Sequence, residues 1–339
     1  MRSLLPALLC ACGFGISATS PLLAATLVPV VPVAGATDTL VSSINDKDII
    51  TGTYVDSGGA KHGYFGTVAG SYTTFDYKAS GNTVPVGIDT AGDITGGYFT
   101  SSTDICASVP FERTAKGKIS VIKKGTKSLS GLAWGMNTKG EFVGYYCDDT
   151  GFVLGYKGKA GKYQSAVTIS GTQLATAPSA INAAETIAGW SVDFSGASKG
   201  FILKGGVTSF VSYPSATQTQ LIGLNDAGLA TGVWTDTHNI QHAFMYDTKK
   251  SKFTSIEPNG ATTSIAGGVN NDGVIALYSD VGTFLYCTNK KKCPKGGADV
   301  ATGKVTHVPA GAFLRYENDA VQLPAKAPQL GVKPPFFAN

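Results

Sequence analysis

The chain has 339 residues, of which 15% are charged and 43 are glycine, and its formal net charge is +4. An apolar fraction of 43% is too high for a disordered chain, and the small net charge excludes a strongly basic nucleic-acid binder. High glycine, few charges and the lack of a long helical pattern predict a β-rich protein.

The first 25 residues have the pattern of a secretory signal peptide. Arg2 supplies the basic start, Leu4 to Ile16 form the apolar core, and Ala24-Ala25 offers a cleavage site. A competing interpretation is lipidation at Cys12, which stands in a short lipoprotein-like box. Because no later stretch approaches 18 apolar residues, we expect no membrane span and a mature chain that is secreted, extracellular or periplasmic.

An apolar residue, an Asn or Asp, and a turn recur six times, at intervals of 43 to 48 residues. The six Asn or Asp residues, called the anchors below, are Asn45, Asp89, Asn137, Asn182, Asn225 and Asn270. Most anchor turns contain glycine, but Asp48 and Glu185 replace it in the first and fourth copies, which predicts a looser turn or a left-handed backbone there. Short strands and turns at this period indicate a β-propeller.

Each repeat continues with further short strands after its anchor. Five copies carry glycine seven residues after the anchor, at Gly52, Gly96, Gly144, Gly189 and Gly232. The sixth copy has Leu277 there, and an aromatic residue follows closely in every copy. Counting the segment before the anchor, each repeat has four strands, which make one blade. We therefore predict an all-β, six-bladed β-propeller over residues 26–324, with seven blades as the alternative, and an extended proline-rich tail over 325–339.

The strand before each anchor is predicted to be innermost in its blade, and the last Thr/Ser-rich strand outermost. A propeller must also join its first and last blades. Two segments compete to complete the last blade, Thr26–Val30 and Ala320–Pro324. Two others compete to be the next aromatic strand of the sixth repeat, Thr283–Tyr286 and Ala312–Tyr316.

Four cysteines follow the predicted signal peptide, Cys106, Cys147, Cys287 and Cys293. An even number in an exported chain predicts two disulfides, for which three connectivities exist. Cys287 and Cys293 bracket a five-residue segment, interpreted as a hairpin tip, so we pair them. The remaining pair, Cys106–Cys147, would then join neighbouring blades. A zinc site is the alternative, but no paired C-x-x-C supports it.

Two basic runs interrupt the low charge density, one at Lys123, Lys124 and Lys127 and one at Lys290–Lys292 with Lys295. We interpret them as solvated hairpin tips that protect strand edges. A patch for an anionic polymer is the sharper alternative, and it requires both runs on one face.

The search for catalytic residues yields no constellation. The four histidines are His62, His238, His242 and His307, and His62 and His242 occupy the same repeat position, which favours a structural role. His238 and His242 flank a turn, so their spacing does not make a helical metal pair. We predict no catalytic residue and no cofactor-binding residue, because no nucleophile elbow and no phosphate loop occurs.

The Asn/Asp-rich turns are candidates for metal binding, chiefly Asn45-Asp46-Lys47-Asp48 and Cys147-Asp148-Asp149. No calcium-loop pattern occurs, so the predicted role is an Asx-capped turn and no metal ligand is assigned. The three tryptophans are Trp134, Trp190 and Trp234. Core packing is the simplest role for them, but two at the channel mouth would suit stacking on a sugar.

The repeat resembles the bacterial extracellular family named after its His-Ala-Phe (HAF) tripeptide, which stands here as His242-Ala243-Phe244. The resemblance covers Leu40 to about Ile256 and, more weakly, the chain to Leu323, and it departs at Leu277. It implies an exported propeller and no defined activity.

Two functions remain open at this level. The first is a binding or scaffold module, expected to be monomeric, for an extracellular glycan or protein partner. The second is a polysaccharide-active hydrolase or lyase with its site in the central channel, which needs acidic or His side chains to converge at one mouth.

Overall fold

The computed structural model describes residues 26–77, 82–99, 105–171 and 173–295. The described chain is all-β apart from two short 3₁₀ turns, η1 (Ile105–Ala107) and η2 (Lys290–Lys292). The predicted signal peptide, the tail, His307 and the segments 312–316 and 320–324 lie outside the described residues. No helix in the described ranges is long and apolar enough to cross a membrane.

The strands form antiparallel groups of four, called blades 1 to 6 in chain order. The first strands of the blades are β2 (Asp38–Ile44), β6 (Asn82–Ile88), β12 (Gly131–Met136), β16 (Gln173–Ile181), β20 (Gln218–Leu224) and β24 (Ser264–Val269). The second strands are β3 (Ile49–Val55), β7 (Ile94–Phe99), β13 (Glu141–Cys147), β17 (Ile187–Asp193), β21 (Leu229–Thr235) and β25 (Val274–Ser279).

The third strands are β4 (Lys61–Thr67), β8 (Ser108–Arg113), β14 (Val153–Lys159), β18 (Ser198–Lys204), β22 (Gln241–Asp247) and β26 (Gly282–Cys287). The fourth strands are β5 (Tyr72–Phe75), β9 (Ile119–Val121), β15 (Lys162–Val167), β19 (Val207–Val211), β23 (Lys252–Ser255) and, for blade 6, the N-terminal β1 (Thr26–Pro29). Two-residue strands β10 (Lys123–Lys124) and β11 (Lys127–Ser128) form an extra hairpin.

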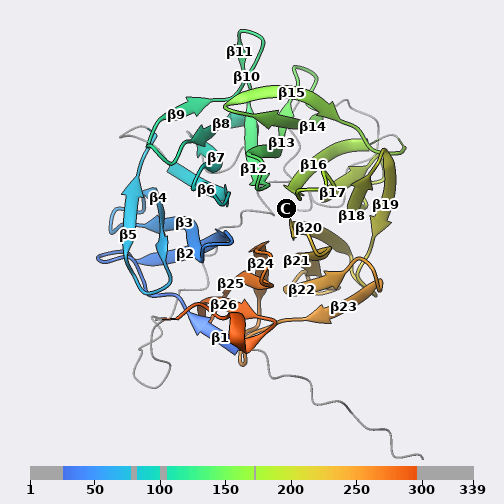
Figure 1. The fold of residues 1–339 in the computed structure, drawn as a ribbon. Coiled ribbons are helices and arrows are strands. Elements are labelled where there is room, and N and C mark those ends of the chain that lie inside the picture. The colour runs from blue at the N-terminus through green and yellow to red at the C-terminus, as the bar shows by residue number, and fades with distance from the viewer. Residues whose placement is uncertain (1–25, 78–81, 100–104, 172, 296–339) are drawn as a thin grey trace, which may run out of the picture.

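The blades surround a central channel, and the strand before each anchor faces it (Figure 1). The first strands of neighbouring blades contact one another, including β2 with β24. The predicted all-β propeller is confirmed, and the strand order runs outward from the pre-anchor strand as expected.

The last blade is completed by the N-terminal strand. β1 pairs antiparallel with β26, from Thr26 opposite Cys287 to Pro29 opposite Phe284. The segment around Thr283–Tyr286 is therefore the third strand of blade 6. This pairing covers an edge that would otherwise present unpaired backbone groups.

Each anchor caps its own turn, and the five Asn anchors also reach the next blade. The Asn45 Oδ1 accepts hydrogen bonds from Lys47 N (2.9 Å) and Ile49 N (3.0 Å), and its Nδ2 donates to Asp89 O (2.8 Å). The other four Asn anchors also donate from Nδ2 to the next anchor's carbonyl, and the Asn270 amide donates to Asn45 O (3.2 Å). The face that carries these turns is called the anchor face.

In the two anchor turns without glycine, Asp48 and Glu185 adopt φ values of 58° and 57°, which is the predicted left-handed backbone.

Asp89 interrupts this ring of amides, because a carboxylate has no hydrogen to donate to Asn137 O. Its Oδ1 accepts from Gly92 N and Asp93 N, both at 2.9 Å. The side chain is buried, and burial together with the charge of Asp93 raises the pKa of Asp89. The junction between blades 2 and 3 thus lacks the side-chain bond found at the other five.

Asp89→Asn is expected to stabilise the protein by about 1 kcal/mol at pH 7, because it supplies the missing donor and removes a buried charge. The gain should shrink at acid pH, where a protonated Asp89 donates as Asn does. Denaturant unfolding at pH 7 and pH 4 measures both effects. Asp149→Asn, which removes a charge whose side chain is 90% exposed, is the control. Equal stability of Asp89→Asn and the parent at pH 7 would contradict the expectation.

The repeated glycine allows an aromatic ring of the third strand to lie across the second strand. Gly144 pairs with Tyr156, whose hydroxyl donates to Leu132 O on the first strand (3.3 Å). Tyr64 makes the same bond to Leu40 O (3.0 Å) opposite Gly52. In blade 6, Leu277 stands in place of this glycine, and its own apolar side chain is fully buried.

Both predicted disulfides are present. Cys106–Cys147 joins the β7–β8 connection of blade 2 to the end of β13 in blade 3. The predicted hairpin tip between Cys287 and Cys293 is wrong, because Lys290–Lys292 form the 3₁₀ turn η2, N-capped by Asn289.

The lysines of β10–β11 do form a hairpin, and it lies across the ring from blade 6 (Figure 1). The two basic runs therefore make no common patch.

Candidate functional site

A β-bulge in every first strand places one residue at the wall of the central channel. The register shifts between Val41 and Ser43, and an equivalent shift occurs in the other five blades. The residues three positions before the anchors are Ser42, Val86, Trp134, Ser179, Ile222 and Gly267. Bulges re-aim side chains in this way, so these six positions vary while the surrounding repeat stays constant.

The channel is narrow near the anchor face. The apolar residues directly before the anchors line it: Ile44, Ile88, Met136, Ile181, Leu224 and Val269. Each of the two spaces they border has a volume of about 50 Å³. The mouth beyond them is polar, and Asn271 Nδ2 there donates to both Asp46 Oδ2 and Asp226 Oδ2 at 2.9 Å. These carboxylates are already paired within the ring.

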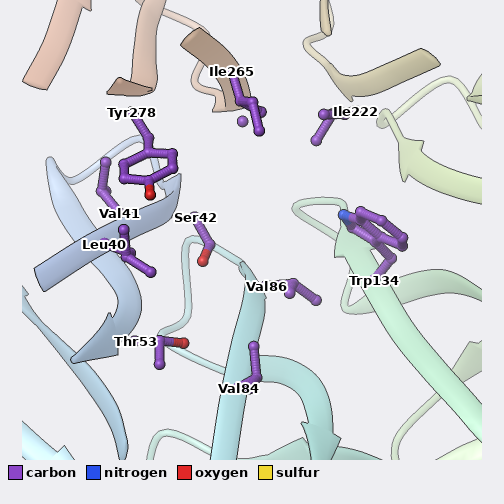
Figure 2. Close-up of a pocket in the computed structure, with 11 residues that line it drawn as sticks. Leu40, Val41, Ser42, Thr53, Val84, Val86, Trp134, Ile222, Ile265 and Tyr278 are labelled. Atoms are coloured by element: carbon purple, nitrogen blue, oxygen red, sulfur yellow. The ribbon is translucent and has the colours of Figure 1, made fainter. Parts of the chain in front are cut away.

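The opposite end of the channel holds a larger pocket of about 100 Å³ (Figure 2). Five blades contribute its lining, which consists of Leu40, Val41, Ser42, Thr53, Val84, Val86, Trp134, Ile222, Ile265, Gly267 and Tyr278. This set, called the channel pocket below, contains no charged side chain. In Figure 2 the Trp134 indole projects toward the pocket with its nitrogen on the inner edge. A mainly apolar lining with a few polar atoms is typical of small-ligand sites.

Of the three tryptophans, only Trp134 lines the channel pocket, so the alternative of two at one channel mouth is not found in the described structure. Trp134 lines the pocket, whereas Trp190 is buried in the core between blades. Trp234 stacks between Tyr213 and His242, with ring centroids 4.4 Å away on each side. The difference follows from position, because Trp134 sits at a bulge of a first strand and the other two sit on second strands.

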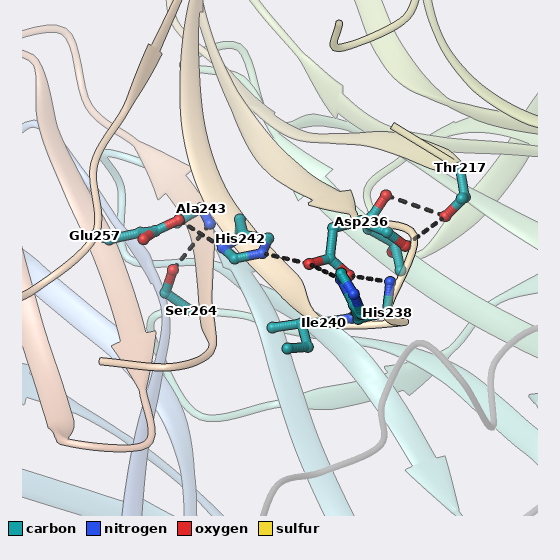
Figure 3. Close-up of polar contacts among 9 residues, drawn as sticks. Thr217, Asp236, His238, Ile240, His242, Ala243, Glu257 and Ser264 are labelled. Atoms are coloured by element: carbon teal, nitrogen blue, oxygen red, sulfur yellow. Dashed lines mark hydrogen bonds and ion pairs between the residues drawn. The ribbon is translucent and has the colours of Figure 1, made fainter. Parts of the chain in front are cut away.

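His242 links a turn to an outer strand (Figure 3). Asp236 Oδ1 accepts from His238 N (2.8 Å) and Ile240 N (2.9 Å), and its Oδ2 lies 3.5 Å from His242 Nε2. The Nδ1 of His242 contacts Glu257 Oε1 at 2.7 Å. The two carboxylates lie at different ring nitrogens, so they hold the imidazole in place and do not converge on a common point.

Blade 1 repeats this arrangement around His62. Its Nδ1 lies 2.9 Å from Asp76 Oδ2 and its Nε2 lies 3.2 Å from Asp56 Oδ2. Tyr54 stacks on the ring, as Trp234 does on His242. Burial opposes protonation, but the hydrogen bonds with the two carboxylates raise the pKa of His62 above its ordinary value. His62 and His242 thus make the same kind of contacts in blades 1 and 5.

The side chains proposed as calcium ligands accept hydrogen bonds within their own turns. Asn45 Oδ1 accepts two backbone N–H groups, and Asp148 Oδ1 accepts from Thr150 N (2.9 Å) and Phe152 N (3.0 Å). Among the described residues, no group of three or more His, Cys, Asp or Glu side chains is arranged to hold a metal ion.

A buried acidic cluster lies where blade 2 meets blade 3. Glu112 on β8 is 4% exposed and accepts a hydrogen bond from the backbone of Gly161 in blade 3. Burial, followed by the charges of Asp93 and Asp89, raises the pKa of Glu112 to about 7. The burial of Glu112 is not evident from its sequence, because an acidic residue in a strand of alternating pattern resembles one that faces solvent.

No protein-family model matches the chain, and no curated protein matches it. Among solved structures, TolB from Acinetobacter baumannii matches with a TM-score of 0.51 and 11% identity, over 72% of this chain and 64% of TolB. An Aleuria aurantia lectin in complex with Fucα1-6GlcNAc matches with a TM-score of 0.47 and 10% identity, over 74% of this chain and 90% of the lectin.

A gluconolactonase from Xanthomonas campestris matches with a TM-score of 0.48 and 10% identity, over 78% of this chain and 90% of that chain. The chain thus spans less than two thirds of TolB but most of the other two. At these identities the likeness concerns the fold alone.

Proposed function

We propose that this protein is an exported, six-bladed propeller of the HAF-repeat type that binds an extracellular ligand in the channel pocket. The single observation that carries the proposal is the pocket lining. It brings apolar side chains from five blades around one indole, and it holds no acidic, basic or His side chain. General acid–base chemistry needs titratable groups at the reacting atom, so this lining favours binding over hydrolysis.

The anchor-face mouth supports the same choice. Three acidic residues line this mouth. Asp46 and Asp226 are both bonded to Asn271, and the buried Asp89 accepts hydrogen bonds from the backbone of its own turn. A hydrolase would need at least one of them free to contact substrate and water. The remaining polar groups at that mouth are the hydroxyls of Thr90 and Thr138 and the anchor amides, which hold the blades together.

A binding screen on the purified full chain tests the proposal. We expect a member of a panel of glycans, polymers and peptides to bind, and Trp134→Ala to weaken that binding at least about tenfold. Trp134→Phe should retain most affinity and fold, and Asp226→Asn on the anchor face should bind as the parent does. A ligand bound equally by Trp134→Ala, or turnover of a polymer by the parent, would contradict the proposal.

A further inference from the structure

The channel pocket borders a position that holds Thr in blade 1 but an aromatic side chain in blades 3, 4 and 6. The residues eight positions after the anchors are Thr53, Gly97, Tyr145, Trp190, Val233 and Tyr278. The aromatic members are buried and pack beside the first strand of the next blade. Leu132 fills the space beside Gly97, coming within 2.7 Å of where an alanine Cβ would stand. The space beside Thr53 remains open as part of the pocket.

The hydroxyl of Thr53 is the second observation. The residue is 1% exposed, and its Oγ1 is buried without a hydrogen-bond partner in the described structure. Buried polar groups are nearly always paired, and each exception requires an explanation. Because Thr53 lines the pocket (Figure 2), a bound molecule can supply the partner.

The lining restricts the chemistry of that molecule. A volume of about 100 Å³ leaves room for no more than one six-membered ring, since a closed cavity that holds benzene has about 150 Å³. No charged side chain is present to compensate a buried ligand charge. A sugar ring carries several hydroxyls, and a mainly aliphatic lining leaves most of them unpaired.

We propose that the channel pocket binds an uncharged aromatic ring with one hydroxyl, a phenol. Its ring takes the place beside Thr53 that Tyr145 and Trp190 fill in their own blades, and its hydroxyl forms a hydrogen bond with Thr53 Oγ1. This inference rests on the proposed function, because it names the ligand class of the same pocket.

Fluorine NMR of the full chain labelled with 5-fluorotryptophan tests the inference. The Trp134 resonance is assigned from its loss in Trp134→Phe, and the other two tryptophans serve as internal controls. We expect p-cresol to shift the Trp134 resonance and to bind about fivefold more tightly than toluene, the difference that one net hydrogen bond provides. Thr53→Val should abolish that preference without changing toluene binding. Thr53→Tyr should fill the pocket, leave the fold intact and prevent both ligands from binding.

Further ligands in the same experiment identify the source of the ring. They also distinguish failure of the phenol inference from failure of the proposed function. Binding of acetyl-Gly-Tyr-Gly-amide more tightly than p-cresol supports a tyrosine of a protein partner, and the reverse supports a free phenol. If methyl α-D-glucoside or a screened glycan shifts Trp134 while p-cresol does not, the phenol inference is wrong and the channel pocket stands. Unchanged p-cresol preference in Thr53→Val also overturns the inference. If no probe and no screened ligand shifts Trp134, both proposals fail.

Discussion

At pH 8, the Glu112→Gln variant is expected to be more stable than the parent chain by up to about 3 kcal/mol. The pKa of Glu112 is raised to about 7 from a reference value of 4.5, chiefly by burial. The folded state therefore binds the proton more tightly than the unfolded state. The stability that Glu112 contributes is fully present below pH 4.5, declines as the pH rises, and is lost above about pH 7.

Denaturant unfolding at pH 4.5 and pH 8 measures this effect for parent and variant. The difference in the free energy of unfolding between the two proteins should be small at pH 4.5 and larger at pH 8, because glutamine cannot ionise. Glu185→Gln is the control, since Glu185 is exposed, Lys157 lowers its pKa, and its loss cannot produce the same trend. A parent chain whose stability advantage over Glu112→Gln grows with pH would show that the Glu112 carboxylate is compensated in the folded state.

Three features of the junction between blades 2 and 3 then fit together. It lacks an anchor amide because Asp89 has no donor, and it buries Glu112 close to Asp89 and Asp93. It is also the junction that the Cys106–Cys147 disulfide crosses. A disulfide limits how far the unfolded chain can separate these blades. We infer that the covalent bond compensates for polar contacts that are unfavourable at neutral pH.

The sequence predicted the repeat well because each of its signals acts locally. An Asn at the head of a turn, a glycine in the second strand and an aromatic residue in the third each have a short-range physical reason. The pairing of Cys287 with Cys293 was also local and is confirmed. The 3₁₀ turn at Lys290–Lys292 was not predicted, since a five-residue segment between two cysteines is compatible with either geometry.

The candidate site cannot be predicted from the sequence because it depends on contacts between blades. Trp134 resembles Trp190 and Trp234 in the sequence, although a bulge gives it a different direction. Aligning the residues eight positions after each anchor is the signal for Thr53, which is small where Tyr145 and Trp190 are large. The sequence predicts that the anchors cap their own turns, but the second bond from each Asn anchor to the next blade depends on how the blades pack.

Gly144→Ala is expected to destabilise the protein by about 3 kcal/mol. An alanine Cβ at this position would stand 2.1 Å from Leu132 O, and the neighbouring Ala133 Cα would be 3.0 Å away. Both are backbone atoms of a paired strand, so no side-chain rotation can relieve the contact. The Tyr156 ring, which lies across Gly144 and bonds to Leu132 O, would be displaced as well.

Denaturant unfolding followed by circular dichroism measures the loss. Gly58→Ala is the matched control, because Gly58 lies in a turn and the atom nearest to its added Cβ is a side-chain oxygen of Asp56 at 3.3 Å, not a backbone atom of a paired strand. That variant should stay within about 0.5 kcal/mol of the parent. Gly232→Ala should behave like Gly144→Ala, since its Cβ would meet Gln220 O at 2.0 Å. If Gly144→Ala matches the Gly58 variant in stability, the close approach of the first two strands is not what requires glycine in the repeat, and the buried Leu277 of blade 6 would then represent an ordinary substitution.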